Sequence, residues 1–99
     1  MGERVYHVYI LARGLGGTLY VGVTSNLVGR VYQHRQKLVT GFTQKYGVAR
    51  LVHFEAFSEI ADAIRREKQL KRWNRAWKVQ LIEEKNSNWD DLYPSITHP

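Results

Sequence analysis

The sequence predicts a small α+β domain in which a three-stranded antiparallel sheet is flanked by about three helices. Three segments are rich in β-branched and aromatic residues and have the length of strands. The first two are separated by only about six to seven turn-forming residues, whereas a parallel crossover needs a dozen or more. Helical periodicity is found in three further stretches. With 99 residues, the chain has room for one such domain.

The three predicted strands are bounded by turn-forming residues. A glycine-rich turn at Arg13–Thr18 joins the first two strands, which favours a hairpin. A loop-like stretch at Gly41–Gly47 comes before the third. The expected strands are Tyr6–Leu11, Leu19–Thr24 and Leu51–Phe57.

The predicted helices follow from capping residues and apolar spacing. Ser25 or Asn26 is expected to cap a first helix that runs to about Leu38, and Ser58 to cap a second. The second and third helices are expected at Glu59–Arg72 and Arg75–Glu84. Residues 1–85 are therefore predicted to form the domain. Residues 86–99, which hold both prolines, are predicted to form a loosely packed tail.

The charge is positive and unevenly distributed. Fifteen Lys and Arg against nine Asp and Glu give a formal charge of +6. Seven of the basic residues lie between Arg65 and Lys78, with Glu67 as the one acid among them. Such a cluster favours salt-dependent binding of polyanions. A solvated helix face and an anionic membrane surface are the alternatives, but the stretch lacks the wide apolar stripe of a membrane-bound helix. Nucleic acid is therefore the expected partner.

Several classes of protein are excluded by what the sequence lacks. It has no cysteine, so a disulfide framework, a cysteine-ligated zinc site and a cysteine nucleophile are excluded. The glycines match neither a P-loop nor a dinucleotide fingerprint, so no small-molecule cofactor is expected. There is no signal-peptide pattern and no apolar run of transmembrane length, so a cytoplasmic location and no membrane partner are expected. Nothing in the sequence indicates an oligomeric state.

Glu67 occupies an unusual position on the second predicted helix. At about 100° per residue, it projects into the face formed by Ile60, Ala63, Ile64 and Leu70. A carboxylate that faces a core costs several kcal/mol unless it is paired, protonated or bound to a metal. An internal salt bridge to an arginine, or a helix register that turns Glu67 outward, would also account for it.

Five sequence elements, in order, resemble the motifs of the GIY-YIG nucleases. His7-Val8-Tyr9 and Tyr20-Val21-Gly22 resemble the two half-motifs, with ten residues between the tyrosines, although His7 stands where the first motif has glycine. Arg30 follows eight residues after Gly22, as in the family. The stretches 41–46 and 63–71 resemble later motifs of a stand-alone, single-domain branch. That branch is related to the nuclease domain of the bacterial excision-repair incision subunit.

The resemblance implies roles for several polar residues. It suggests Tyr9 as general base or water-positioning group, with Tyr20 as its partner. His34, one helical turn after Arg30, would orient Tyr9 or carry its proton, and Tyr46 would donate a hydrogen bond to phosphate. A tyrosine with an ordinary pKa is a poor base, so Arg30 and a cation would have to favour its phenolate.

The residues also indicate chemistry without the resemblance. Arg30 offers a planar, permanently charged fork for phosphate oxygens. Glu67 offers a hard oxygen suited to Mg²⁺, with Mn²⁺ as a substitute, because Mg²⁺ takes one or two protein carboxylates and keeps several waters. The residues expected to bind the nucleic-acid backbone are Arg65, Arg66, Lys68, Arg72 and Arg75.

The sequence therefore predicts a magnesium-dependent DNA endonuclease with weak sequence selectivity. A preference for DNA structure and a role in DNA repair or processing are expected by analogy only, and RNA stays open as a substrate. The alternative is a non-catalytic nucleic-acid-binding module that keeps the nuclease fold. A structural adaptor would explain neither the charge cluster nor the set formed by Tyr9, Tyr20, Arg30 and Glu67.

Overall fold

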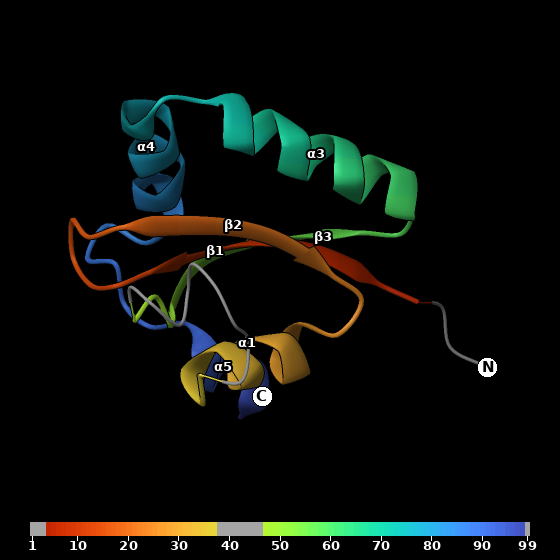
Figure 1. The fold of residues 1–99 in the computed structure, drawn as a ribbon, viewed down its shortest axis with the longest axis horizontal. Helices are drawn as coiled ribbons and strands as arrows, with labels where there is room; N and C mark the ends of the chain where they lie inside the picture. The colour runs from red at the N-terminus through yellow and green to blue at the C-terminus, as the bar shows by residue number, and fades with distance from the viewer. Residues whose placement is uncertain (1–3, 38–46, 99) are drawn as a thin grey trace.

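A three-stranded antiparallel sheet is the centre of the fold (Figure 1). The computed structural model describes residues 4–37 and 47–98. Strands β1 (Tyr6–Ala12), β2 (Leu19–Thr24) and β3 (Arg50–Phe57) lie in the order β2-β1-β3, and both pairs are antiparallel. The predicted α+β class is confirmed. Because β2 pairs only with β1 among the described strands, its outer side is an edge of the sheet that they form.

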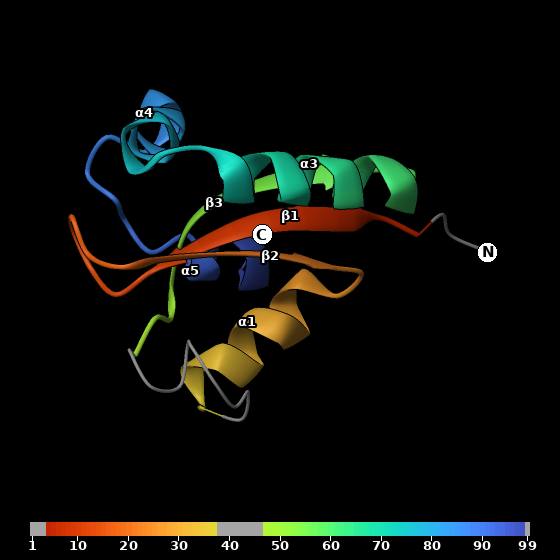
Figure 2. The ribbon, with the colours of Figure 1, turned by 45° about the horizontal axis from the view of Figure 1, so that its top comes forward.

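Helices cover both faces of the sheet (Figures 1 and 2). Helix α3 (Ile60–Arg72) lies along one face, and α4 (Arg75–Lys85) follows at its end. Helices α1 (Leu27–Arg35) and α5 (Tyr93–Thr97) lie on the other face. Since neighbouring strand residues point to opposite faces, β1 supplies both cores. Val8 and Ile10 pack in the cluster under α3, while Tyr9 and Leu11 pack in the cluster under α1.

The helix ends differ slightly from the expected ones. Asn26, not Ser25, caps α1 by accepting a 3.0 Å hydrogen bond from the backbone N–H of Gly29. Helix α3 begins after Glu59 with no side-chain cap, so Ser58 is not its N-cap. No helix among residues 4–37 and 47–98 has both the length and the apolar character needed to cross a membrane.

The apolar face of α3 is narrower than predicted. Ala63 and Leu70 are fully buried, whereas Ile60 is 52 % and Ile64 37 % exposed. The helix therefore contacts the sheet through one side of the expected face. Glu67 lies at the margin of that contact, with its side chain 13 % exposed.

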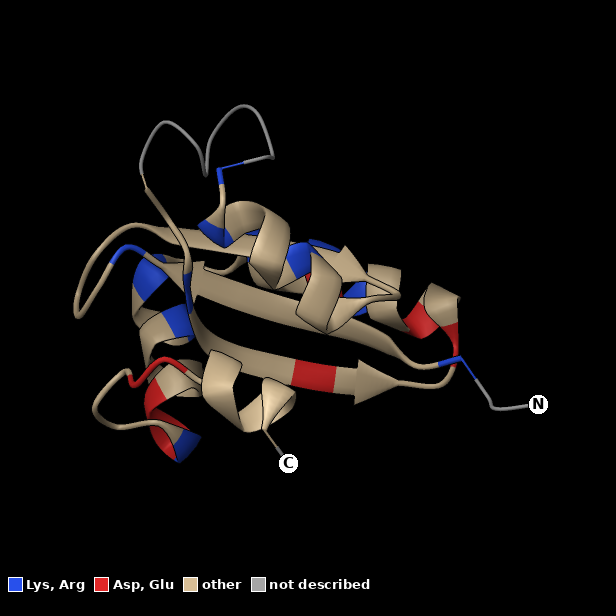
Figure 3. Cartoon of the chain, turned by 90° about the horizontal axis from the view of Figure 1, so that it is seen from below, with Lys and Arg blue, Asp and Glu red and all other residues tan. Residues whose placement is uncertain are grey.

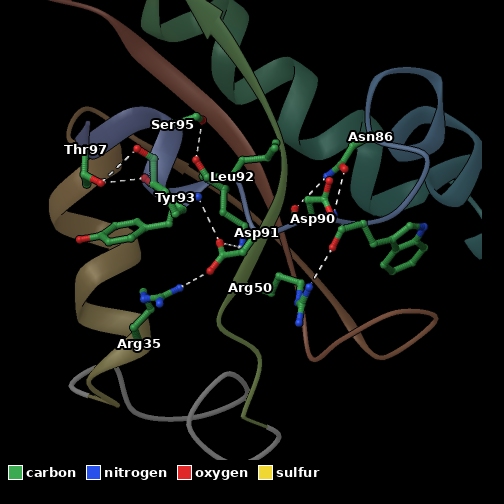
Figure 4. A network of polar contacts seen from close by, with 12 residues as sticks. Arg35, Arg50, Asn86, Asp90, Asp91, Leu92, Tyr93, Ser95 and Thr97 are labelled. Carbon is green, nitrogen blue, oxygen red and sulfur yellow. Dashed lines mark hydrogen bonds and ion pairs between the residues drawn. The ribbon is translucent and has the colours of Figure 1, made fainter. Parts of the chain in front are cut away.

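The last residues are packed rather than loose, which differs from the expectation for 86–99. Trp89 is 1 % and Asn86 7 % exposed. The Asn86 amide donates to the carbonyls of Val52 (3.1 Å) and Asp90 (2.9 Å). Figure 4 shows this network. Prolines and turn formers predict irregular backbone, but irregular backbone can be buried when side chains such as Asn86 satisfy it.

A second set of contacts joins the chain before α5 to α1 and β3. The Asp91 carboxylate accepts from Arg35 (2.6 Å) and from the backbone N–H of Leu51 (3.2 Å) (Figure 4). Arg35 also lies over the ring of Tyr93, 4.7 Å from its centroid. These contacts link α1 to β3 and hold the helix against its face of the sheet.

We expect Trp89→Ala to lower the free energy of unfolding by about 3–5 kcal/mol. The substitution leaves a large cavity in the core under α3 and removes the 2.7 Å hydrogen bond that the Trp89 indole donates to Glu83. Urea unfolding followed by circular dichroism measures the effect. Trp77→Ala is the matched control, since Trp77 is 54 % exposed, and we expect it to cost less than about 1 kcal/mol. Equal losses in the two variants would contradict the packed C-terminal segment.

Candidate active site

The Tyr9 ring crosses from β1 over β2 because the residue opposite has no side chain. Tyr9 pairs with Gly22 in the register of the two strands. A Cβ atom on Gly22 would lie only 2.5 Å from both Cζ and Oη of Tyr9, which is far inside van der Waals contact. The glycine therefore makes room for the phenol and lets its hydroxyl reach the edge strand.

Tyr20 and His34 complete an aromatic cluster around Tyr9. Tyr20 precedes Gly22 by two residues, so its side chain lies on the same face of the sheet as the Tyr9 ring, which is the face that α1 covers. The Tyr20 ring centroid lies 6.3 Å from that of Tyr9 and 5.3 Å from that of His34. The Tyr9 hydroxyl is 3.2 Å from Nε2 of His34. His34 itself is 2 % exposed.

Helix α1 brings Arg30 and His34 to this cluster together. Leu27 and Val31 are buried and fix the helix against the sheet. Arg30 and His34 are four residues apart and so lie on one side of the helix. Arg30 hydrogen-bonds the Tyr9 side chain, and it also donates to Oε1 of Gln33 at 3.1 Å.

The Tyr9 phenol is a weaker acid than usual. Burial, with a smaller contribution from Tyr20, raises the pKa of Tyr9 to about 12, and the Glu67 carboxylate acts in the same direction. The hydrogen bond and the charge of Arg30 lower the pKa but do not outweigh these effects. Tyr9 is therefore protonated at neutral pH in the protein alone, and Arg30 by itself does not produce a phenolate.

His34 is neutral under the same conditions. Burial, and then the positive charge of Arg30, lower the pKa of His34 from 6.5 to about 4. A neutral imidazole can accept a hydrogen bond at one ring nitrogen. Since the Tyr9 oxygen accepts from Arg30, its own proton is available for Nε2 of His34. The phenol can therefore donate a hydrogen bond to the imidazole, whose lowered pKa makes it a weak proton acceptor in the protein alone.

Glu67 approaches the cluster from the other layer of the fold. Helix α3 packs on the face of the sheet opposite Tyr9, yet the charge of Glu67 affects the pKa of Tyr9. Glu67 is ion-paired with Lys71 at 2.5 Å, and the Lys71 side chain is 53 % exposed. The sequence leaves open an internal salt bridge between Glu67 and an arginine. The observed partner is instead a lysine, one turn along the same helix.

The donor set at Glu67 fits a hard cation that keeps most of its water. Among residues 4–37 and 47–98 there is no group of three or more His, Asp and Glu that could enclose a metal ion. Glu67 is largely shielded from solvent and is paired with a solvent-exposed lysine, and a single carboxylate of this kind suits the sparse protein ligation that Mg²⁺ accepts. Lys71 competes for the same oxygen.

The predicted nucleic-acid-binding residues fall into two groups. Arg66 is held by both carboxylate oxygens of Glu55 (2.8 and 3.1 Å), and Arg75 donates to the carbonyls of Gly16 and Gly17 (2.7 and 2.8 Å). These two arginines have structural partners. Three others lie on the exposed surface of α3, and one of them, Arg65, also pairs with Asp62 at 2.8 Å. The exposed set is Arg65, Lys68 and Arg72.

Two lysines next to Tyr20 were not singled out from the sequence. Lys71 of α3 and Lys78 of α4 line a hollow of about 310 Å³ together with Leu19, Tyr20 and Val21 of β2. The sequence feature that indicates a role for Lys71 is its position four residues after Glu67, one helical turn away.

Basic positions also lie along α1 and at the β1–β2 turn (Figure 3), so positive charge extends beyond α3. Tyr46 lies outside the described residues.

The fold and this cluster define a known class of catalytic domain. Residues 5–80 match the family model described as the GIY-YIG catalytic domain. The chain belongs to the GIY-YIG family and has its nuclease-type fold, which implies a nucleic-acid substrate.

The relatives are small proteins of similar length. A UPF0213 protein of Syntrophus aciditrophicus is 35 % identical over 79 residues, covering 79 % of this chain and 90 % of the relative. A UPF0213 protein of Clostridium perfringens is 36 % identical over 80 residues, covering 81 % and 85 %. The solution NMR structure of a UPF0213 protein from Bacillus halodurans is similar with a TM-score of 0.56 at 29 % identity, covering 91 % of this chain and 95 % of that one.

We expect Gly22→Ala to displace Tyr9, because the new methyl group would overlap the phenol. The free energy of unfolding should fall by about 1–3 kcal/mol, and the His34 ring resonances should shift in NMR spectra as the Tyr9 contact is lost. Gly14→Ala is the matched control, since nothing lies within 4 Å of its added Cβ. A Gly22→Ala variant with unchanged stability and unchanged His34 resonances would show that the ring does not depend on this gap.

We expect His34 to destabilise the fold as the pH falls from about 7 to about 5. The unfolded chain takes up a proton near pH 6.5, whereas the folded protein resists protonation until about pH 4. The difference in unfolding free energy between wild type and His34→Gln, measured by urea titration at several pH values, isolates this effect from the carboxylates. If this difference in unfolding free energy stayed constant between about pH 7 and about pH 5, His34 would not be a buried imidazole that resists protonation.

Proposed function

We propose that the chain is a metal-dependent endonuclease that hydrolyses phosphodiester bonds in DNA. The observation that carries the proposal is the surroundings of the Tyr9 hydroxyl. It contacts His34, is hydrogen-bonded by Arg30, and feels the charge of Glu67 from the opposite layer. A cation, a phenol and a neutral imidazole, with a carboxylate whose charge reaches the phenol, form a set suited to phosphoryl transfer to water.

Arg30 binds the scissile phosphate in this proposal. Its guanidinium is permanently charged and can give two hydrogen bonds to phosphate oxygens. The half-buried position of Arg30 strengthens this attraction relative to an exposed arginine. The same residue holds the Tyr9 oxygen, so the phosphate and the group that accepts the proton of the attacking water are brought to one place.

Tyr9 and His34 handle the proton of the attacking water. The water oxygen forms the new bond to phosphorus while its proton moves to the Tyr9 oxygen. The phenolic proton passes at the same time to Nε2 of His34, and the negative charge of the phosphate bound at Arg30 favours this transfer by raising the pKa of His34, which is about 4 in the protein alone. Tyr20 packs beside both rings and keeps them in position. The bond to the leaving oxygen breaks, and that oxygen takes up a proton from solvent.

Glu67 is the residue that would hold the metal, and we propose Mg²⁺, with Mn²⁺ as a substitute. When bound, such an ion neutralises charge on the phosphate and on the leaving oxygen. Glu67 has to exchange its ion pair with Lys71 for this role.

The substrate is read mainly through its backbone. The exposed cations Arg65, Lys68 and Arg72 suit phosphate contacts, which carry no sequence information. We therefore propose weak sequence selectivity and a preference, where there is one, for DNA structure. A role in repair or processing rests on analogy with the excision-repair nuclease domain.

A non-catalytic nucleic-acid-binding role is the second candidate. The Glu67–Lys71 pair favours it, because a carboxylate satisfied by a lysine needs no metal. Such a protein would bind DNA equally well with and without Glu67 and would not cleave it.

Cleavage of linear, flap, branched and single-stranded DNA with Mg²⁺ or Mn²⁺ tests the two candidates. We expect Arg30→Ala and Glu67→Gln each to lose at least about 100-fold in rate, as for other groups that stabilise charge in a transition state. Glu84→Gln is the matched control for Glu67, since Glu84 is exposed on α4. Isothermal titration should also show weaker Mn²⁺ binding by Glu67→Gln. Wild type that binds but never cleaves would favour the non-catalytic role.

A further inference from the structure

The hollow beside Tyr20 joins three elements that are distant in sequence. Leu19, Tyr20 and Val21 line it from β2, Lys71 from α3 and Lys78 from α4, around a space of about 310 Å³. The Tyr20 ring lies 6.3 Å from that of Tyr9. The hollow, which we call the β2-edge subsite, therefore opens next to the candidate active site and shares Tyr20 with it.

The charge of the β2-edge subsite is positive and incompletely balanced. Within the described parts of the chain, Lys71 and Lys78 are its two cations and no carboxylate lines it. Lys71 is paired with Glu67. Lys78 is half-buried, and its ammonium group has no ion pair or hydrogen bond to any residue within 4–37 and 47–98. A lysine in the wall of a hollow, without a counter-ion among the described residues, has its charge available to an anion, so its position points to an anionic ligand.

We propose that the β2-edge subsite binds the backbone phosphate next to the scissile one on the same strand. The proposal rests on the proposed nuclease function for the placement of the scissile phosphate at Arg30. A strand held there continues past Tyr20, and the adjoining phosphate meets Lys78. Leu19 and Val21 provide apolar surface for the intervening sugar.

The kind of cation also fits this role. A lysine is a flexible point charge that attracts phosphate without the fixed fork of arginine. Lys78 would therefore position the backbone without reading bases. When Glu67 holds a metal ion instead of Lys71, the Lys71 ammonium group becomes a second cation for the phosphate. Phosphate binding in the subsite would then depend on what the Glu67 carboxylate binds.

Binding of a fluorescent DNA oligonucleotide in EDTA, followed by anisotropy over a range of salt concentrations, tests the subsite without any metal or cleavage. We expect Lys78→Gln to weaken binding about 3- to 10-fold and to reduce the slope of log K against log salt by about 0.7–0.9, the loss of one phosphate contact. Lys85→Gln removes the same charge from an exposed position on the same helix and should change both quantities much less. Lys71 is left intact because its loss would also free Glu67.

A second measurement locates the phosphate. On a substrate whose cut has been mapped, a single uncharged methylphosphonate at the adjoining linkage should weaken binding by wild type and cause no further loss in Lys78→Gln. Equal binding by Lys78→Gln and Lys85→Gln, or additive losses at the methylphosphonate, would overturn the subsite. Cleavage by wild type together with equal binding by the two variants would leave the nuclease standing and remove only the subsite. Thermal unfolding of each variant confirms that the fold is intact.

Discussion

The close approach of the Tyr9 ring to the backbone of Gly22 is the constraint on which the site depends. Any side chain at Gly22 would occupy the space of the phenol, 2.5 Å from its oxygen. With that space open, the Tyr9 hydroxyl reaches the edge of the sheet, where α1 supplies Arg30 and His34. The glycine of the second half-motif thus acts through lateral packing between strands, since it lies within β2 and no turn requires it.

An edge strand explains how residues from opposite layers can meet. The buried contact of Ala63 and Leu70 sets α3 on one face, and Tyr9 belongs to the core on the other. The charge of Glu67 nevertheless reaches the Tyr9 phenol, and β2 is the outer strand of the sheet within residues 4–37 and 47–98. The same edge admits Lys78 from α4. Both the candidate active site and the β2-edge subsite therefore follow from the position of β2 in the strand order.

Local signals were sufficient for the fold, and long-range contacts were not predictable. The strands and most helix limits follow from residue type and spacing, and the shielded position of Glu67 follows from helical periodicity. The burial of Trp89 depends on Asn86 reaching Val52, 34 residues away in the chain. The partner of Arg66 is likewise set by the fold. The sequence predicts that Arg66 binds nucleic acid, because no local pattern identifies Glu55, eleven residues earlier, as its partner. The roles of the site residues stay predictions.

The electrostatics of Tyr9 show why a cation matters to this arrangement. Burial raises the pKa of the phenol to about 12 even with Arg30 beside it, and the charge of Glu67 adds to the effect. A carboxylate that opposes ionisation of its neighbour is unfavourable for base chemistry as long as its negative charge is free. Positive charge placed on Glu67 would cancel that contribution, and the shielding from water that makes the phenol weak would make the new attraction strong. Lys71 supplies a single such charge from a side chain that is 53 % exposed to water, so a divalent ion would have the larger effect on Tyr9.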